Sequence, residues 1–244
     1  MPFLIVSDIH GNREALEAVL AAAKGRYDRI LCLGDLVGYG SDPNFVVDWA
    51  RENVVAIIRG NHDKVCAGLE SLYLYRPAAR AAAEWSRHVL TPENLDYLER
   101  LPRGPLPYKD FDLVHGSPFD EDEYLVTMQD VTAVAGEVTT WLSFIGHTHV
   151  QGGFLIARAG SHTSVKPIDP HVTLELDEKY RYLVNPGSVG QPRDGDPRAA
   201  YAIYYPDERR VEFHRVAYDV AAAAEKIRAA GLPDPLASRL FSGV

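Results

Sequence analysis

The stretch Phe3-Leu4-Ile5-Val6-Ser7-Asp8-Ile9-His10-Gly11-Asn12 places a short apolar run directly before polar and small residues. Its first half, Phe3–Ser7, is typical of a buried strand, and residues 12–24 repeat apolar side chains at helical spacing. Residues 29–33 and 54–58 predict two more strands, with a second helix over 44–53 between them. Because strands and helices alternate, we expect parallel strands covered by helices, which is an α/β fold.

The rest of the chain has a different pattern. We predict that Lys64–Arg100 forms a helical, cap-like insertion within one domain spanning residues 1–244, because about 40 residues are too few for a separate core. Strands are predicted over 111–115, 141–145, 153–157, 172–176, 180–184, 200–205 and 211–216. Residues 177–179 and 206–208 predict hairpin turns, and a final helix over 220–230 is expected to end at Gly231.

The charge balance of the chain is acidic. Asp and Glu number 34 against 25 Lys and Arg, which gives a formal net charge of −9. Extended nucleic-acid binding needs a cationic surface, so this composition argues against it. A small phosphate-bearing substrate remains compatible with the composition, provided that its site supplies positive charge locally.

Cysteine usage and hydropathy indicate an intracellular setting. The two cysteines, Cys32 and Cys66, form no CxxC motif and predict no disulfide. The apolar run at the N-terminus covers only Phe3–Val6, and no later run approaches the roughly 18 apolar residues of a membrane span. We therefore expect a cytoplasmic protein that does not enter a membrane.

Five short fragments place Asp, Asn or His beside glycine at the ends of predicted strands. They are Ser7–Asn12, Gly34–Gly40, Gly60–Asp63, Val114–Ser117 and Gly146–His149. Because parallel strands end on one edge of a sheet, we expect these side chains to gather there. Carboxylate, amide and imidazole groups without a thiolate suit Mn, Fe or Zn rather than a thiolate-bound structural zinc.

The spacing within two fragments indicates how their side chains are directed. Asp8 and His10 are two residues apart, as are His147 and His149, so in an extended segment each pair points to one side. The fragments offer more ligands than one ion with open positions needs, and such a set suits a dinuclear centre. One carboxylate must then bridge the ions, and Asp35 is the natural choice between the other strand ends.

The ordered motifs D-x-H, G-D-x-x, G-N-H-[DE], H-G and G-H-x-H, between Phe3 and His149, resemble those of the calcineurin-like metallophosphoesterases. The loop Asn185–Gly190 extends the resemblance, which implies a four-layer α/β/β/α sandwich with the site at the sheet edge. By position, the implied ligands of the first metal are Asp8, His10, Asp35 and His149, and those of the second are Asp35, Asn61, His115 and His147. The resemblance also implies that His62 is a phosphate-contacting general acid, and we expect Asp63 to orient it or support its charge.

The resemblance implies two divalent metal ions and a bridging hydroxide that attacks phosphorus in line with the leaving oxygen. We expect phosphodiester hydrolysis, as in the small bacterial and archaeal phosphodiesterases of the superfamily. One alternative is a phosphomonoesterase acting on a small metabolite. Another is a non-catalytic scaffold similar to the superfamily's retromer subunit, although that alternative predicts lost ligands and here every ligand position is filled. Gly38 and Tyr39 replace the Asp and Arg of protein phosphatases and diadenosine tetraphosphatases, which disfavours both activities.

Arginines are the remaining candidates for substrate binding. Arg193 follows the Asn185–Gly190 loop and is a candidate phosphate clamp, with Asn61 as a second substrate-binding residue. Arg76, Arg80 and Arg87 of the insertion offer further cations, although a solvated helix face is the simpler interpretation of them. The expected partner is a small phosphate ester. The oligomeric state and the choice among Mn, Fe and Zn stay open at this point.

Overall fold

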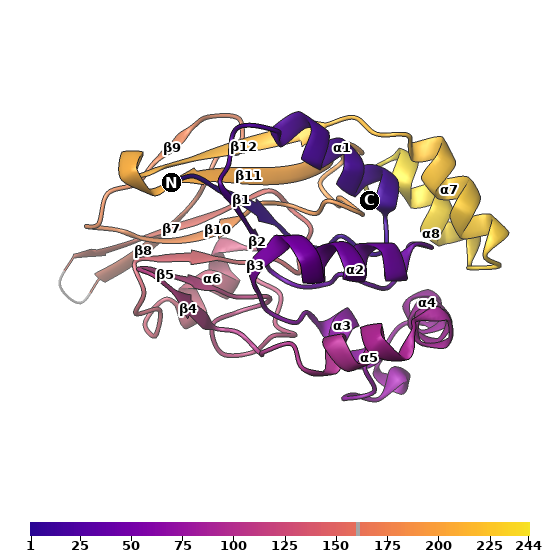
Figure 1. Ribbon diagram of the computed structural model, residues 1–244. Helices are drawn as coiled ribbons and strands as arrows, with labels where there is room; N and C mark the ends of the chain where they lie inside the picture. The colour runs from indigo at the N-terminus through magenta and orange to yellow at the C-terminus, as the bar shows by residue number, and fades with distance from the viewer. Residues whose placement is uncertain (160–161) are drawn as a thin grey trace.

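Two six-stranded β-sheets pack face to face and carry helices on their outer surfaces (Figure 1). The computed structural model describes residues 1–159 and 162–244. The α/β architecture expected from the alternating pattern, and the α/β/β/α layering implied by the resemblance, are both confirmed. No helix in this described part of the chain is long and apolar enough to cross a membrane.

The first sheet is built around the three parallel strands that the N-terminal pattern predicts. Its order is β3 (Val54–Ile57), β2 (Arg29–Cys32), β1 (Phe3–Val6), β11 (Ala199–Tyr205), β12 (Arg210–Val216) and β9 (Leu174–Glu175). β2 pairs in parallel with β1 and β3, whereas β11 runs antiparallel to β1 and β12. The crossovers are the helices α1 (Arg13–Ala23) and α2 (Pro43–Asn53), so the carboxyl ends of β1, β2 and β3 share one edge.

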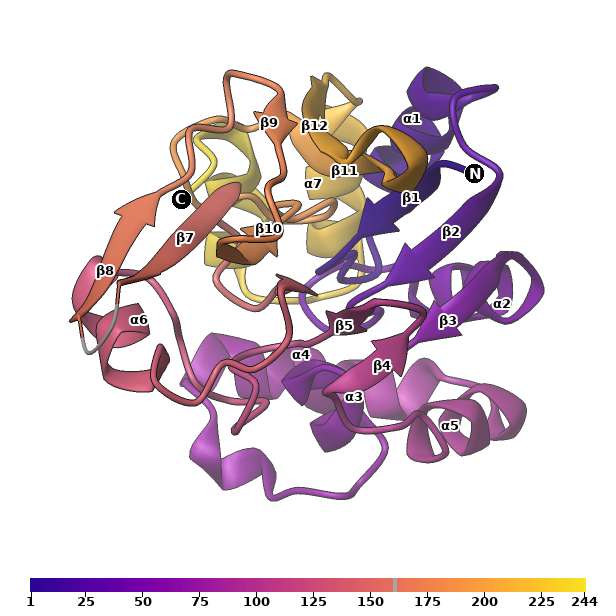
Figure 2. The same ribbon diagram turned by 90° about the vertical axis from the view of Figure 1, so that its left-hand side faces the viewer.

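The second sheet brings the later fragments to the same side of the molecule. Its order is β4 (Leu106–Tyr108), β5 (Phe111–Leu113), β6 (Leu142–Phe144), β10 (Arg181–Asn185), β7 (Gly152–Ala159) and β8 (His162–Pro167). β6 pairs in parallel with β5 and β10, and the outer strands pair antiparallel (Figure 2). The fragments that follow β5, β6 and β10 therefore emerge at adjacent positions.

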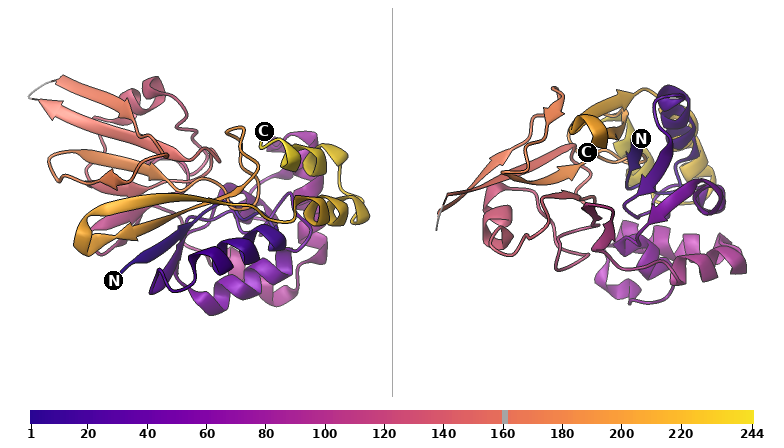
Figure 3. Two further views of the ribbon diagram at one scale, coloured as in Figure 1. Left: turned by 90° about the horizontal axis from the view of Figure 1, so that it is seen from above. Right: turned by 60° about the vertical axis from the view of Figure 1, so that its left-hand side comes forward.

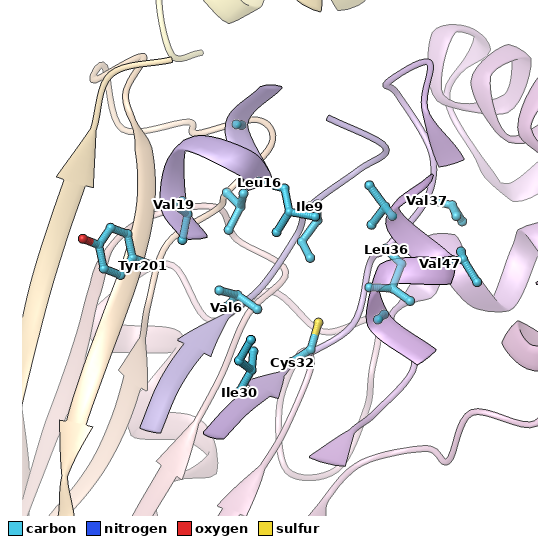
Figure 4. Close-up of a cluster of buried hydrophobic side chains, with 14 of the residues drawn as sticks. Val6, Ile9, Leu16, Val19, Ile30, Cys32, Leu36, Val37, Val47 and Tyr201 are labelled. Carbon is cyan, nitrogen blue, oxygen red and sulfur yellow. The ribbon is translucent and has the colours of Figure 1, made fainter. Parts of the chain in front are cut away.

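Three apolar cores lie between the four layers. The left panel of Figure 3 shows the layers from above. The central core lies between the sheets and includes Phe3, Phe144 and Tyr204. A second core packs Leu16 of α1 and Val47 of α2 against the first sheet (Figure 4). The third lies beneath α6 (Met128–Val134), which covers the second sheet. These cores hold both sheets rigidly at the edge where the polar fragments lie.

The predicted insertion is helical and contacts both α2 and the C-terminal helices. It begins within α3 (Asn61–Cys66) and contains the single turn η1 (Leu72–Leu74), α4 (Pro77–Val89) and α5 (Pro92–Glu99). Asn44 of α2 donates to Val89 O at 2.7 Å and accepts from Thr91 N at 2.9 Å, which anchors the junction of α4 and α5. On its other side, α4 packs Ala82 against the C-terminal helices α7 (Val220–Ala229) and α8 (Asp234–Ser238).

One of the two predicted hairpins is wrong. The turn at residues 177–179 lies between β9 and β10, which belong to different sheets, so it carries the chain across the sandwich. Apolar alternation identifies a strand but not its neighbour, and β9 pairs with Arg210 and Val211 far along the chain. The turn at Pro206–Glu208 does join the antiparallel pair β11 and β12.

Two strands and two α-helices among the described residues were not expected from the sequence. They are β4, β8, α6 and α8. α6 carries a local signal, because Thr127 and Asp130 form a capping box at its first turn. The other three are only three to six residues long and have no comparable signal. The helix predicted over residues 220–230 is α7, and it ends as predicted, with Gly231 at a φ of 72° just beyond it.

Candidate metal centre and active site

Two groups of buried side chains lie where the strands end, and they share one carboxylate. Within each group, one nitrogen or oxygen atom per residue lies within 4.8 Å of the others. The first group contains Asp8, His10, Asp35 and His149, and the second contains Asp35, His115 and His147. Asn61 lies beside the second group, because its Oδ1 is 3.2 Å from His115 Nε2. The structure thus brings together all the predicted ligands, with Asp35 common to the two groups.

Backbone carbonyl groups orient most of the imidazoles. The Nδ1 atoms of His10, His115 and His149 lie 2.9, 2.7 and 2.5 Å from the carbonyl oxygens of Val37, Leu33 and Gln191. A proton on each Nδ1 leaves the lone pair of Nε2 facing the centre, as is usual for metal-binding histidines. The Nε2 atoms of His10 and His149 are only 3.1 Å apart. Two facing lone pairs at this distance require a cation or a proton between them.

His147 uses its other nitrogen. Its Nε2 donates to Asp122 O at 3.2 Å, which leaves Nδ1 for the centre. The backbone N–H of His147 also donates to Asp8 Oδ2 at 3.2 Å, so one ligand residue positions another. Tyr124 packs on the imidazole with its ring centroid 3.9 Å away. Contacts on both sides therefore restrict the rotation of this ring.

Asp8 shows that the buried groups suit a cation. Its side chain is fully buried, and Oδ1 has no hydrogen-bond partner among the described residues. The nearest imidazole atom is His149 Nε2 at 3.3 Å, whose proton is on the opposite nitrogen in the arrangement above. A buried carboxylate oxygen without a partner is strongly unfavourable, and a bound metal ion removes that penalty.

The backbone is strained at five of the seven predicted ligand residues. Asp8, His10, Asp35, His147 and His149 have φ values of 54°, 50°, 56°, 66° and 60°. This left-handed conformation costs a residue with a Cβ atom roughly 1–3 kcal/mol, and its concentration at one site is typical of functional positions. The left-handed turn after each strand directs the side chain back toward the sheet edge. The surrounding layers must therefore supply the free energy that keeps these residues in place.

The protonation preferences of the centre follow from burial and from Asp35. Burial lowers the pKa of His10 and His149, and it lowers that of His147 to about 3. Burial also opposes ionisation of Asp35, but the charge of His115, together with a hydrogen bond from His115 and the other nearby imidazoles, outweighs burial and holds the Asp35 pKa well below its usual range. Burial lowers the pKa of His115, but the neighbouring carboxylates and hydrogen bonds together raise it to about 10. Without metal, the centre thus favours an ionised Asp35 beside a protonated His115, with His10, His147 and His149 neutral. His115 must lose its proton before it can bind a divalent cation.

Asp63 has a different role from the one predicted. Its two carboxylate oxygens accept from the backbone N–H groups of Asp35, Leu36, Val37 and Gly60, at 2.7 to 3.3 Å. Both oxygens are used in this way, so Asp63 fixes the loop that carries the shared ligand Asp35. The side chain of His62 is not among its partners. Neighbouring positions in sequence misled the prediction because consecutive residues in the first turn of α3 point in different directions.

His62 is held by its backbone and by a phenol. Its N–H donates to Asp35 Oδ1 at 2.8 Å, and its Nε2 lies 3.0 Å from Tyr39 OH. Its Nδ1 is buried and has no hydrogen-bond partner in the described chain. Gly38 lies against this nitrogen, since a Cβ at Gly38 would come within 2.4 Å of it. The replacement of Asp by Gly noted in the sequence therefore leaves room for the imidazole, and Tyr39 contacts its opposite side.

A cavity of about 550 Å³ adjoins the centre. Asn61, His62 and His147 line it beside the metal-binding groups, and Tyr39, Tyr75 and Tyr124 add aromatic surface. Arg76, Arg193 and Arg239 supply positive charge. Apart from Tyr39, which was noted only as a departure from a motif, the tyrosines were missed by the sequence analysis, as was Arg239. None of these residues belongs to a local motif.

The arginines of the insertion have separate roles. Arg76 lines the cavity, whereas Arg80 lies 5.7 Å from the ring of Tyr73. Arg87 donates from Nη2 to Val65 O at 2.5 Å and from Nε to Cys66 O at 3.2 Å. It therefore satisfies carbonyl groups at the end of α3. Of the three, only Arg76 lies where it can meet a substrate.

Comparison with known families agrees with this geometry. Residues 1–209 match the model of the calcineurin-like phosphoesterase superfamily domain. The chain belongs to this superfamily. The family match and the two metal-binding groups together support a metal-dependent phosphoesterase.

Two relatives are similar in sequence to this superfamily member over almost its whole length. An uncharacterized protein of Methanocaldococcus jannaschii is 37% identical and is aligned over 98% of this chain and 97% of its own. A metallophosphoesterase from Sphaerobacter thermophilus is 43% identical, with a TM-score of 0.86 and coverage of 100% and 99%. A protein from Pyrococcus horikoshii shares the fold at 19% identity, with a TM-score of 0.78 over 100% and 98% of the two chains. The similarity to these proteins therefore includes the C-terminal segment beyond residue 209.

Proposed function

We propose that this protein is a dinuclear metal-dependent phosphodiesterase. The observation that carries the proposal is the position of Asp35, whose carboxylate belongs to both groups of metal-binding atoms. A carboxylate shared in this way would support two ions held close together. The absence of thiolates and the mixture of carboxylate, amide and imidazole groups favour Mn, Fe or Zn.

The protein holds the metals and leaves space for a substrate. In the proposed centre, Asp8, His10, Asp35 and His149 bind one ion, and Asp35, Asn61, His115 and His147 bind the other. Such a pair of ions supplies an activated water molecule for attack at phosphorus and neutralises charge on the phosphoryl oxygens. The adjoining cavity opens beside Asn61 and His147, so a phosphoryl group can approach the second group of ligands from there.

His62 is the proposed proton donor. Its backbone N–H is bound to the shared ligand Asp35, and its side chain lines the cavity. Burial lowers the pKa of His62 to about 4, so the free ring is mainly neutral near pH 7, and the proposed role requires the negative charge of a bound phosphate ester to raise that pKa. Tyr39 OH contacts Nε2 and is in turn 3.3 Å from Arg193 Nη2. Tyr39 is therefore the positioning residue for His62 in this proposal.

The size and lining of the cavity support a diester substrate. A volume of about 550 Å³ is far larger than a phosphoryl group and can hold an organic group on the phosphorus. The three tyrosine rings provide apolar surface for such a group. The alternative of a phosphomonoesterase shares every metal ligand and differs only in the substrate that it prefers. The non-catalytic scaffold is disfavoured because all ligands and His62 lie in one connected site.

Metal content and hydrolysis of model substrates test the proposal together. Protein reconstituted with Mn should contain about two ions per chain and hydrolyse bis-p-nitrophenyl phosphate. Asp35→Asn should lose both properties, whereas the matched exposed variant Asp48→Asn should keep both. Binding of fewer than one ion, with no turnover in Mn, Fe, Co, Ni or Zn, would refute the enzyme assignment. A clearly higher kcat/KM for p-nitrophenyl phosphate would show a monoesterase.

A further inference from the structure

Two arginines in the lining of the cavity share a neutral acceptor. Arg193 Nη2 and Arg239 Nη1 donate to the same atom, Gln191 Oε1, at 3.1 and 3.2 Å. Both side chains line the cavity. Two guanidinium groups on one amide oxygen repel each other, and that oxygen carries no net charge to offset them. An anion between them would remove this repulsion.

No carboxylate side chain compensates the two arginines. Within residues 1–159 and 162–244, neither Arg193 nor Arg239 forms an ion pair with an Asp or Glu side chain. Arg193 Nε is buried and lacks a hydrogen-bond partner in the same part of the chain. Burial, reinforced by the charge of Arg193, lowers the pKa of Arg239. The pair therefore faces the cavity without a carboxylate side chain to offset its positive charge.

The acidic residues of the cavity already have a cation of their own. Glu70 and Asp122 both contribute to its lining, and both contact Lys64 Nζ, at 3.0 and 2.5 Å. They are therefore unavailable to neutralise the arginines. The cavity is thus bordered by two carboxylates that share one ammonium group and by two guanidinium groups that have no carboxylate side chain as partner. This asymmetry favours an anionic ligand that extends toward the two arginines.

Arg239 is placed there by the C-terminal segment. It lies in the single turn η3 (Arg239–Phe241), and its Nε donates to the main-chain oxygen of Val244 at 2.7 Å. Gly195 N donates to Gly243 O at 2.9 Å, which joins this segment to the loop that follows Arg193. A Cβ at Gly243 would lie 2.7 to 2.9 Å from the backbone of Asp196, so the two segments are in close contact. The two guanidinium groups are therefore preorganised.

The arginine pair lies beyond the reacting centre. His62 Nε2 contacts Tyr39 OH, Tyr39 OH contacts Arg193, and Arg193 shares Gln191 with Arg239. Arg239 hydrogen-bonds to none of the predicted metal ligands in the described chain. It also lies outside residues 1–209, which match the superfamily domain. A phosphoryl group held at the metals therefore leaves Arg239 free for a different group of the same ligand.

We propose that Arg193 and Arg239 form a subsite for a second anionic group, and that the substrate carries such a group in addition to the phosphoryl that reacts. A phosphate or carboxylate can accept two parallel hydrogen bonds from a guanidinium, which suits this pair. The inference rests on the proposed function, because it assumes that the first phosphoryl group binds at the metals. It assigns Arg239 as a specificity-determining residue of that site.

Equilibrium binding of matched nucleotides tests the subsite without relying on turnover. The ligands are thymidine 5′-monophosphate, thymidine 5′-diphosphate and thymidine 3′,5′-bisphosphate, titrated calorimetrically into Mn-loaded protein, with chromatography confirming that each stays intact. At least one doubly phosphorylated ligand should bind about 10- to 100-fold more tightly than the monophosphate. In Arg239→Ala this ratio should fall close to one, and Arg239→Lys should give an intermediate value.

Arg228→Ala is the matched control. Arg228 is an exposed arginine of α7 that pairs with Asp234 at 2.7 Å and does not line the cavity, so its removal should leave the ratio unchanged. The proposal is wrong if no second phosphate improves binding in the wild type, or if the improvement survives in well-folded Arg239→Ala and Arg239→Lys. If the proposed function fails instead, bis-p-nitrophenyl phosphate will stay intact while a doubly phosphorylated ligand still binds more tightly than the monophosphate.

Discussion

At the scale of single residues, the centre depends on side chains that act on the backbone of other segments. The imidazoles of His10 and His149 are oriented by carbonyl groups of distant loops. Asp63 gathers the N–H groups of the loop that carries Asp35. These contacts explain how a left-handed backbone, which is unfavourable at each ligand, persists at several positions together. They also distinguish the residues that would contact a substrate from the residues that only hold those residues in position.

His62→Asn tests the proposed proton donor. We expect turnover of bis-p-nitrophenyl phosphate to fall about 10²- to 10⁴-fold, because a positioned acid contributes that much. Metal content should stay at the wild-type value, since His62 belongs to neither group of metal-binding atoms. Steady-state kinetics with elemental analysis of the same sample measures both quantities. A simultaneous loss of metal and activity would show that His62 is a ligand instead.

Asp63→Asn tests the structural role that replaces its predicted catalytic one. Asparagine offers one acceptor oxygen where the carboxylate serves four N–H groups with two. We expect a loss of about 1–3 kcal/mol in the free energy of unfolding, together with reduced metal content because the Asp35 loop loosens. Chemical denaturation followed by circular dichroism measures the first effect. An unchanged free energy of unfolding with lower activity would instead return Asp63 to the catalytic machinery.

At the scale of secondary-structure elements, α3 links the metal centre to the insertion. It is only six residues long, yet its first residues are Asn61 and His62. So short a helix is not stable alone and must be held by its neighbours. Arg87 of α4 provides such a contact by donating to the carbonyl groups of Val65 and Cys66. The insertion therefore positions His62 as well as shaping the cavity.

Arg87→Ala should destabilise α3 while leaving the cavity lining intact. Loss of two hydrogen bonds from a cation at a helix C-terminus predicts a decrease of roughly 1–3 kcal/mol in the free energy of unfolding. Hydrogen exchange should show faster exchange of the amides of α3. Arg80→Ala on the same helix is the control and should change little, because the Arg80 guanidinium lies 5.7 Å from an exposed tyrosine ring and forms no ion pair with any residue that the structure describes. Equal effects of the two variants would rule out a specific role for Arg87.

At the scale of the whole molecule, charge and strain converge on the metal centre. The chain has a net charge of −9, and two divalent ions would bring it to −5. The buried metal-ligand side chains, whose removal from water is unfavourable, lie where the edges of both sheets meet. Bound metal therefore stabilises contacts between segments far apart in sequence. Stability and metal binding should consequently be coupled throughout the fold.

Metal removal is expected to lower the melting temperature. Mn at about 100 times its dissociation constant stabilises the native state by about 2.7 kcal/mol for each independent site. Differential scanning calorimetry before and after chelation, and again after Mn is restored, measures the shift. His62→Asn should keep the stabilisation by Mn, whereas Asp35→Asn should lose most of it. A melting temperature that does not respond to Mn in the wild type would contradict metal binding at these residues.

Much of the fold and the ligand set could be predicted from local sequence. A strand such as β1 followed by Asp8 and His10 is readable because apolar pattern, turn residues and ligand spacing lie within a few positions. The crossover at residues 177–179 was misread, because the pairing of β9 with β12 depends on distant residues. The same limitation applied to Asp63, whose partners lie up to 28 residues away.

The sequence by itself determined the alternating architecture and the types of ligand, and the resemblance of its motifs to a known family implied how the ligands divide between two groups. The determinants of the first two are short-range, since each ligand lies close to the end of its own strand. Only the tertiary structure decided what surrounds the centre: Tyr39 at His62, Asp63 beneath Asp35, and Arg239 beside Arg193. Arg239 reaches Arg193 because Gly243 of the C-terminal segment packs against the loop around Asp196. Both arginines then contact Gln191, which lies 48 residues before Arg239. Contacts across such separations arise from packing of whole layers, and no local pattern encodes them.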